Sequence, residues 1–268
     1  MGRDYAAELN EELPLVREEA IRGPVGETGL ELARVSPRPD LPYEFQVVNT
    51  NVINAFAVPG GFIYMNRGLL EESENMSEVA GVLAHEVGHV VARHSAEQLE
   101  RARAAGLGLT LGSIVLGRPS GLAQLGVNVA ANLYFARHSR AAESEADRLA
   151  VDLMVEAGWH PCGIVAFFRT LLVERGSKPG ALTSLFASHP LTEERIREVG
   201  RLVASIPRSE LEGLRRSMPA YDRMKNALTD YPPPPEKYRV DEEEGDDGEA
   251  ALDREAADAL ASDVCPAG

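Results

Sequence analysis

The sequence predicts an α+β fold that is mainly helical and contains one small, mainly antiparallel sheet. Three β-rich runs lie between residues 43 and 65, and helical patterns follow from residue 75 to residue 205. No internal repeat divides the 268 residues, and 44% of them are hydrophobic. One hydrophobic core can therefore hold most of the chain.

The N-terminal part combines one expected helix with the three expected strands. Residues 3–22 have the pattern of an acidic amphipathic helix. The β-rich runs are Tyr43–Val48, Val52–Val58 and Phe62–Met65. Pro59-Gly60-Gly61 separates the last two and predicts a tight turn between them.

Asn75 predicts the start of a long helix, because Glu78 follows three residues later in a capping-box-like pattern. No proline interrupts this pattern until well past residue 100, so we expect one continuous helix. Further helices are expected over residues 141–157, 161–175 and 192–205.

Charge and composition divide the chain into three parts. Residues 1–210 form the expected main domain and residues 211–230 a helical extension. Residues 231–268 form a proline-led acidic tail, which we expect to be mobile from residue 236. Residues 241–268 carry eleven acids and one base, and so supply −10 of the net charge of −15. The rest is only mildly acidic, which argues against a nucleic-acid partner.

Residues 105–136 are glycine-rich and apolar, and they could contact a membrane. Arg118 and Pro119 interrupt them, and the first half is too short to span a bilayer. A buried helical hairpin, or one that covers a site, is the favoured prediction, with peripheral membrane contact as the alternative.

The two cysteines, Cys162 and Cys265, match no metal or redox spacing. We expect a buried thiol and an incidental one, with a disulfide as the alternative. The first residues lack the apolar core of a signal peptide. The protein is thus expected in the cytoplasm, or in the cell envelope if an export leader has been removed.

The long helix carries a pattern typical of metal chemistry, His85-Glu86-Val87-Gly88-His89. Histidines four residues apart lie about 40° apart around a helix, so both rings can reach one ion. From Val79 to Ala92 these two histidines and Glu86 are the only polar side chains. Because buried charges need a partner or a metal, we predict that His85 and His89 bind zinc and that Glu86 is a general base.

A third ligand is expected from the helix over residues 141–157. Glu143 falls at the edge of its apolar stripe, whereas Glu145 falls among exposed residues. His94 would point about 140° away from His89 if the first helix continued. We therefore predict that Glu143 is the ligand and that Glu145 is a solvated surface acid.

Asp147 lies one turn after Glu143 on the same side of that helix. It could accept a hydrogen bond from the second ring nitrogen of a ligating histidine. The alternative is an ion pair with Arg140 or another nearby base. His138 and His160 are expected to have no special role.

Four ordered motifs resemble those of the HtpX/Ste-type zinc metallopeptidases, a gluzincin family. The resemblance covers about residues 3–205 and is strongest with the soluble BepA-like bacterial envelope proteases, although this chain ends in an acidic tail instead of their frequent helical repeats. The motifs are Asn54-Ala55-Phe56-Ala57-Val58-Pro59-Gly60-Gly61, Ala84-His85-Glu86-Val87-Gly88-His89, Glu143-Ser144-Glu145-Ala146-Asp147, and His189-Pro190 with Arg195.

The resemblance implies a zincin-type catalytic domain with one zinc ion per chain and endopeptidase activity on extended or unfolded protein substrates. It also implies a role in envelope protein quality control. His189 and Arg195 would bind substrate or stabilise the oxyanion, with inhibitory zinc ligation by His189 as the alternative. Asn54, Ala55, Phe56 and Ala57 would lie on an edge strand that pairs with substrate. The alternative function is a gated, nearly inactive protein that binds clients like a chaperone.

Overall fold

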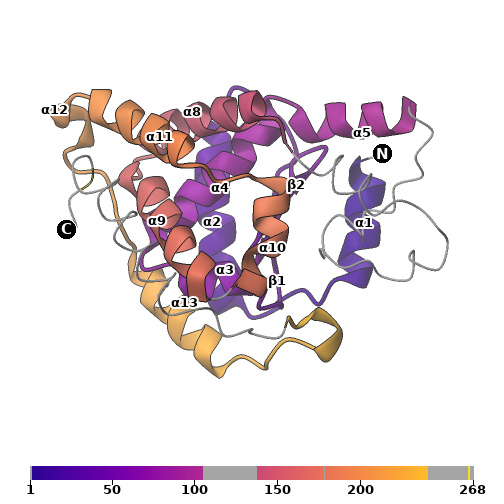
Figure 1. Cartoon of the computed structure of the whole chain (residues 1–268). Helices are drawn as coiled ribbons and strands as arrows, with labels where there is room; N and C mark the ends of the chain where they lie inside the picture. The colour runs from indigo at the N-terminus through magenta and orange to yellow at the C-terminus, as the bar shows by residue number, and fades with distance from the viewer. Residues whose placement is uncertain (1, 105–137, 178, 241–264, 266–268) are drawn as a thin grey trace.

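The structure is a computed structural model that describes residues 2–104, 138–177, 179–240 and 265. It confirms the predicted fold class, because the described residues are mostly helical and form one small sheet. Helix α4 (Met76–Val91) lies in the middle of the molecule (Figure 1). It packs against α2 (Glu19–Val35), α8 (Arg140–Glu156), α9 (Cys162–Ser177) and the strand β2 (Ala55–Val58).

The sheet has the strand order β1-β3-β2, where β1 is Glu44–Val48 and β3 is Phe62–Asn66. Strands β2 and β3 are antiparallel, and the turn between them contains Gly60 and Gly61 with φ of 108° and 99°. Strand β1 is parallel to β3, so the sheet is mixed where we expected it to be mainly antiparallel. The chain reverses direction twice between β1 and β3, which gives these two neighbours the same direction.

Helix α4 begins as predicted, because the Asn75 side chain accepts hydrogen bonds from the backbone N–H groups of Ser77 and Glu78. From Met76 to Val90 every residue except Val82 is buried. The helix ends at Val91, and the expected continuation past residue 100 is wrong. Arg93 has the left-handed φ of 64°, which breaks the helix before α5 (His94–Ala104).

The single helix expected over residues 3–22 is also wrong. Helix α1 (Gly2–Glu12) ends before Pro14, and the backbone N–H of Val16 then bonds to the carbonyl of Val47 in β1. Helix α2 follows although its sequence contains Pro24 and three glycines. Tertiary packing outweighs this low helix propensity. A Cβ atom on Gly29 would lie only 2.5 Å from the Phe45 ring, so the glycine permits close packing of α2 on the sheet.

The other expected helices are confirmed as α8, α9 and α11 (Glu193–Ser205), each within two residues of the predicted bounds at both ends. Within the described ranges no helix is long and apolar enough to span a membrane. The predicted hairpin over residues 105–136 lies outside the described residues. The remaining helices of the described part are α3 (Arg67–Glu72), α10 (Pro179–Ser188), α12 (Arg208–Leu211), α13 (Pro219–Asp230) and the 3-10 helix η2 (Glu236–Tyr238).

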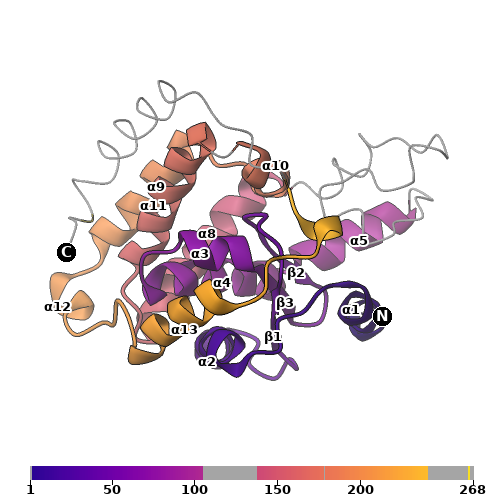
Figure 2. The same cartoon turned by 90° about the horizontal axis from the view of Figure 1, so that it is seen from below.

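Helix α13 lies alongside α2 (Figure 2), and the proline run that follows is bound to the main domain. Arg67 Nη1 donates to the carbonyl of Pro232 at 2.8 Å, and Thr50 Oγ1 donates to the carbonyl of Tyr238 at 2.6 Å. The backbone N–H of Val240 donates to Asn51 Oδ1 at 2.9 Å. Residues 236–240, which we expected to be mobile, thus form hydrogen bonds with the main domain, while residues 241–264 and 266–268 lie outside the described part.

The prediction of unpaired cysteines is wrong. Cys162 and Cys265 form a disulfide whose Cα atoms are 5.7 Å apart. Cys162 begins α9, and the next residue, Gly163, packs so closely on α4 that a Cβ atom would lie 2.1 Å from the Ser77 carbonyl oxygen. The disulfide therefore attaches a distant part of the chain to a helix that supports the centre of the fold.

Candidate metal centre

Helix α4 brings its two predicted ligands together on one face. The Nε2 atoms of His85 and His89 lie 2.9 Å apart, and both side chains are buried. Glu86 is 2% exposed, and burial raises the pKa of its carboxyl group. A buried carboxyl with a raised pKa next to two imidazoles has the properties of a general base.

Glu143, from the first turn of α8, faces these histidines as predicted. Its Oε1 lies 3.4 Å from His89 Nε2, and its Oε2 lies 3.5 Å from His85 Nε2. The helices approach closely because residue 88 is glycine, where a Cβ atom would lie 2.9 Å from the Ala146 carbonyl oxygen. The Glu145 side chain is 60% exposed, as expected for a surface acid, although it also contacts His94.

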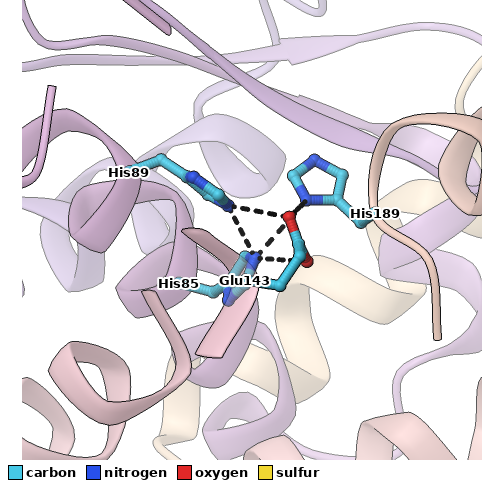
Figure 3. A group of neighbouring side chains, drawn as sticks. All are labelled: His85, His89, Glu143 and His189. Atoms are coloured by element: carbon cyan, nitrogen blue, oxygen red, sulfur yellow. Dashed lines mark hydrogen bonds and ion pairs between the residues drawn. The ribbon is translucent and has the colours of Figure 1, made fainter. Parts of the chain in front are cut away.

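His189, which follows α10, completes the group of four side chains in Figure 3. Its Nδ1 lies 3.1 Å from Glu143 Oε1 and 3.4 Å from His85 Nε2. One donor atom from each of the four residues lies within 4.8 Å of the others, and all four are buried. Three segments of the chain therefore meet at a single point.

This group fits a tetrahedral metal ion. Zinc bonds of about 2.0–2.1 Å place tetrahedral donors roughly 3.3–3.4 Å apart, close to the spacings between these atoms. Among the described residues Glu143 Oε2 has no hydrogen bond of good geometry, although Arg195 Nη1 forms an ion pair with it at 2.5 Å. A buried carboxylate oxygen with one ion-pair partner can also accept a metal.

The pKa values of three of these side chains also favour metal binding. Burial and the neighbouring His85 hold the pKa of His89 well below its ordinary value, so His89 is neutral. Burial alone would raise the pKa of Glu143, but His189 and Arg195 hold it well below its usual range. Burial alone would lower the pKa of His85, but hydrogen bonds to Asp147 and Glu143 raise it to about 9. Metal binding would therefore release a proton from His85.

Asp147 and Arg195 form hydrogen bonds and ion pairs with the side chains that would bind the metal. Asp147 Oδ1 lies 2.9 Å from His85 Nδ1, in the expected position for orienting that ring. Arg195 Nε donates to Asp147 Oδ2 at 2.6 Å, and Arg195 Nη1 contacts Glu143. Arg195 was expected to face substrate or the oxyanion, but the structure places its buried guanidinium between two acids.

His94 and His138 belong to the centre, contrary to expectation. His94 Nδ1 lies 2.9 Å from His89 Nδ1, because the left-handed Arg93 turns the chain back where a continuous helix was expected. The His138 ring stacks on the His89 ring with 4.0 Å between centroids, and burial and His189 lower the pKa of His138 to about 3. Helical periodicity could reveal neither residue. His160 has an ordinary role, accepting the N–H of Cys162.

Strand β2 lies at the edge of the sheet, as predicted for Asn54–Val58. The N–H of Asn66 bonds to the carbonyl of Asn54, so alternation along the strand directs the N–H and C=O of Ala55 and Ala57 outward. In the described part of the chain no backbone group bonds to these outward atoms. Ala55 is buried and Ala57 is partly buried, so the outward backbone groups of Ala57 are the more accessible ones.

A three-stranded sheet beside a buried His-Glu-x-x-His helix, with a glutamate from a later helix, defines a gluzincin metallopeptidase. The chain belongs to peptidase family M48, whose family model matches residues 22–203. The resemblance predicted from the motifs is thereby confirmed, and the described residues include a buried group that could hold a metal ion.

Several characterised proteins are similar to the chain. The beta-barrel assembly-enhancing protease of Escherichia coli (strain K12) is 30% identical over 207 residues, which are 74% of this chain and 42% of that protein. Metalloprotease YcaL of the same organism is 34% identical over 166 residues, 61% of this chain and 63% of YcaL. The mitochondrial metalloendopeptidase OMA1 of Schizosaccharomyces pombe is 34% identical over 166 residues, 62% of this chain and 48% of OMA1. The chain thus spans less than two thirds of each relative.

Proposed function

We propose that this protein is a zinc-dependent endopeptidase that cleaves extended segments of protein substrates. The observation that carries this proposal is the convergence of His85, His89 and Glu143 beside the buried carboxyl of Glu86. Hydrolysis of casein by the zinc-loaded chain, with loss after chelation and recovery on adding zinc, is the direct test. A fully metal-loaded chain that cleaves no protein or peptide would contradict it.

The roles of the side chains follow from their positions. A zinc ion held by His85, His89 and Glu143 would supply a Lewis acid and lower the pKa of a water molecule. Glu86 takes the proton of the attacking water and transfers it to the leaving amine. Asp147 keeps His85 in the tautomer whose Nε2 faces the ion. Arg195 keeps Glu143 and Asp147 ionised and in place.

The outer edge of β2 would bind the substrate as an added strand. The outward groups of Ala55 and Ala57 can form backbone hydrogen bonds with any extended peptide, which allows broad sequence tolerance. Asn54 is 3% exposed, and its Oδ1 has no hydrogen-bond partner among the described residues. A substrate N–H could satisfy this oxygen.

The position of His189 beside the three predicted ligands supports the inhibitory alternative. Its Nδ1 lies among the metal donors, and its Nε2 is 3.7 Å from Glu86 Oε1. We therefore propose that His189 is a fourth ligand that must withdraw before substrate is cleaved. His189→Ala is expected to raise kcat on a short peptide about tenfold or more and to weaken zinc binding.

A lower kcat of His189→Ala would instead indicate that His189 stabilises the oxyanion. If His189 donates a hydrogen bond to the oxyanion, His189→Ala should lower kcat by roughly ten- to a thousandfold. His160→Ala is the matched control, since His160 lies outside the centre and should leave kcat unchanged. Steady-state kinetics and a zinc competition assay on the same preparations separate the two roles.

A gated protein that binds clients without cleaving them is the second candidate. The position of His189 among the metal donors favours gating but does not by itself provide a client-binding surface. This candidate requires two results. The chain must protect a client protein from aggregation, and the His189→Ala variant must still show no hydrolysis. Hydrolysis by that variant would exclude it.

We further propose that the protein works in an oxidising compartment, such as the bacterial cell envelope, in protein quality control. The Cys162–Cys265 disulfide supports this, because disulfides persist mainly outside the reducing cytoplasm. One relative is a beta-barrel assembly-enhancing protease, which agrees with an envelope role. When cells are quenched in acid and the precipitated protein is then alkylated at neutral pH in denaturant, we expect no labelled cysteine unless a reductant is added first. Full labelling of both cysteines without reductant would contradict the proposed oxidising compartment.

A further inference from the structure

Two cavities of different chemistry lie at opposite ends of β2, and each is also lined by side chains of the metal centre. The first, of about 40 Å³, is lined mainly by Ala55 at the start of β2 and by apolar side chains of α4, α9 and α10. Its polar lining comes from the metal centre, namely His85, Glu86, His189 and Arg195. The second, of about 190 Å³, is lined by Val58 and the turn after it, by His89 and by Arg38 and Arg93. A peptide that pairs with β2 would therefore meet an apolar cavity at one end and a cationic cavity at the other.

Strand direction determines which part of the substrate meets each cavity. An added strand pairs slightly more stably in the antiparallel orientation. Because β2 runs from Ala55 to Val58, an antiparallel substrate has its N-terminal part beside Val58 and its C-terminal part beside Ala55. The cationic cavity then lies before the scissile bond and the apolar cavity after it.

We propose that this peptidase selects an acidic side chain before the scissile bond and a small apolar side chain directly after it. This inference rests on the proposed peptidase function. At roughly 3.4 Å per residue, the distance from Ala55 to the turn after Val58 places the acidic residue about two to four positions before the cleaved bond.

The size of the first cavity argues for a small side chain. Its volume is only about three times the 10–15 Å³ that one water molecule requires, so alanine or valine fits better than leucine or phenylalanine. Val82 lines this cavity one turn before Glu86 and is the only partly exposed residue between Met76 and Val90. Val82 is thus the side chain that most directly limits what enters.

The charge of the second cavity argues for an acid. Arg38 Nη1 donates to the carbonyl of Val90 at 3.2 Å, and no described carboxylate lies within ion-pair distance of Arg38. Among the described residues, Arg93 forms an ion pair only with Glu100, at 3.9 Å, and both of these side chains are more than half exposed. Such a pair is weak, so both guanidinium groups can attract a substrate carboxylate.

The test compares cleavage of peptides of equal length that differ in the acidic position before the scissile bond or in the position directly after it. Both the zinc-loaded full chain and the His189→Ala variant are used. We expect kcat/KM to favour Asp or Glu over Lys before the cleaved bond by about fivefold or more, and to favour Ala or Val over Leu after it. Arg38→Gln and Arg93→Asn should each reduce the first preference about threefold, and 0.5 M salt should reduce it further. Arg34→Gln, on an exposed position of α2, is the matched control.

Val82→Ala should shift the second preference toward Leu about tenfold without changing the first, while Val155→Ala, a partly buried valine far along α8, should change neither. Cleavage without either preference, or preferences that survive these variants, would overturn this inference and leave the peptidase function intact. Preferences on the reversed sides of the cleaved bond would overturn the strand direction. If neither protein cleaves any peptide, the peptidase function itself fails.

Discussion

Glu86→Gln is expected to lower hydrolysis about a hundred- to ten-thousandfold while the chain keeps about one zinc ion. The amide has nearly the shape of the carboxylate but cannot take the proton of the attacking water. Glu86 is buried and its oxygen lies 3.7 Å from His189 Nε2 rather than in the group of donors, so metal binding should survive. Kinetics on one peptide and metal content by mass spectrometry measure the two effects separately.

Substitution of a metal ligand should have a different effect from substitution of the general base Glu86. His85→Ala and Glu143→Ala each remove one donor from the cluster and should lose both zinc and activity. Glu145→Gln is the matched control for Glu143, since it alters a mostly exposed acid on the same helix and should keep both. Equal zinc content in Glu143→Ala and the unchanged protein would refute the ligand assignment.

Arg195→Ala is expected to lower the free energy of unfolding of the metal-free protein by about 3–5 kcal/mol. The substitution removes the cation from between Glu143 and Asp147 and leaves two carboxylates buried close together. Chemical denaturation after chelation measures the change. Arg197→Ala, whose side chain is 54% exposed and pairs with Glu193, should change it by less than about 1 kcal/mol.

The effect of Arg195 should also depend on pH. Both carboxylates have a lowered pKa in the folded chain, so their ion pairs stabilise the fold fully above the ordinary carboxyl pKa of about 4. This contribution is lost as the pH falls through the lowered values. The difference between the unchanged protein and Arg195→Ala should therefore shrink below about pH 4. A difference that stays constant down to pH 2 would mean that Arg195 acts through packing alone, for example on Phe168.

Much of the site could be predicted because helical geometry fixes relative directions within one element. The spacing of His85 and His89 placed both rings on one face, and the apolar stripe of α8 distinguished Glu143 from Glu145. The turn at Pro59 and the capping at Asn75 also follow from local chemistry and were predicted correctly.

The rest depends on contacts between distant segments. His94 joins the centre only because Arg93 adopts a left-handed backbone, which few non-glycine residues do. His138 is placed by its stacking on a ring almost fifty residues away in the chain. The pairing of Cys162 with Cys265 depends on a close approach that spacing cannot reveal. Helix α2 forms against its own propensity because the sheet packs on it.

The metal centre takes its side chains from three segments, and this has a consequence for the order of synthesis. His85 and His89 leave the ribosome early, but Glu143, His189 and Arg195 follow much later in the chain. A partly made chain that ends before residue 143 has both histidines and Glu86 but lacks the carboxylate ligand. The nascent chain can therefore assemble the full group of four side chains only when its main domain is nearly finished.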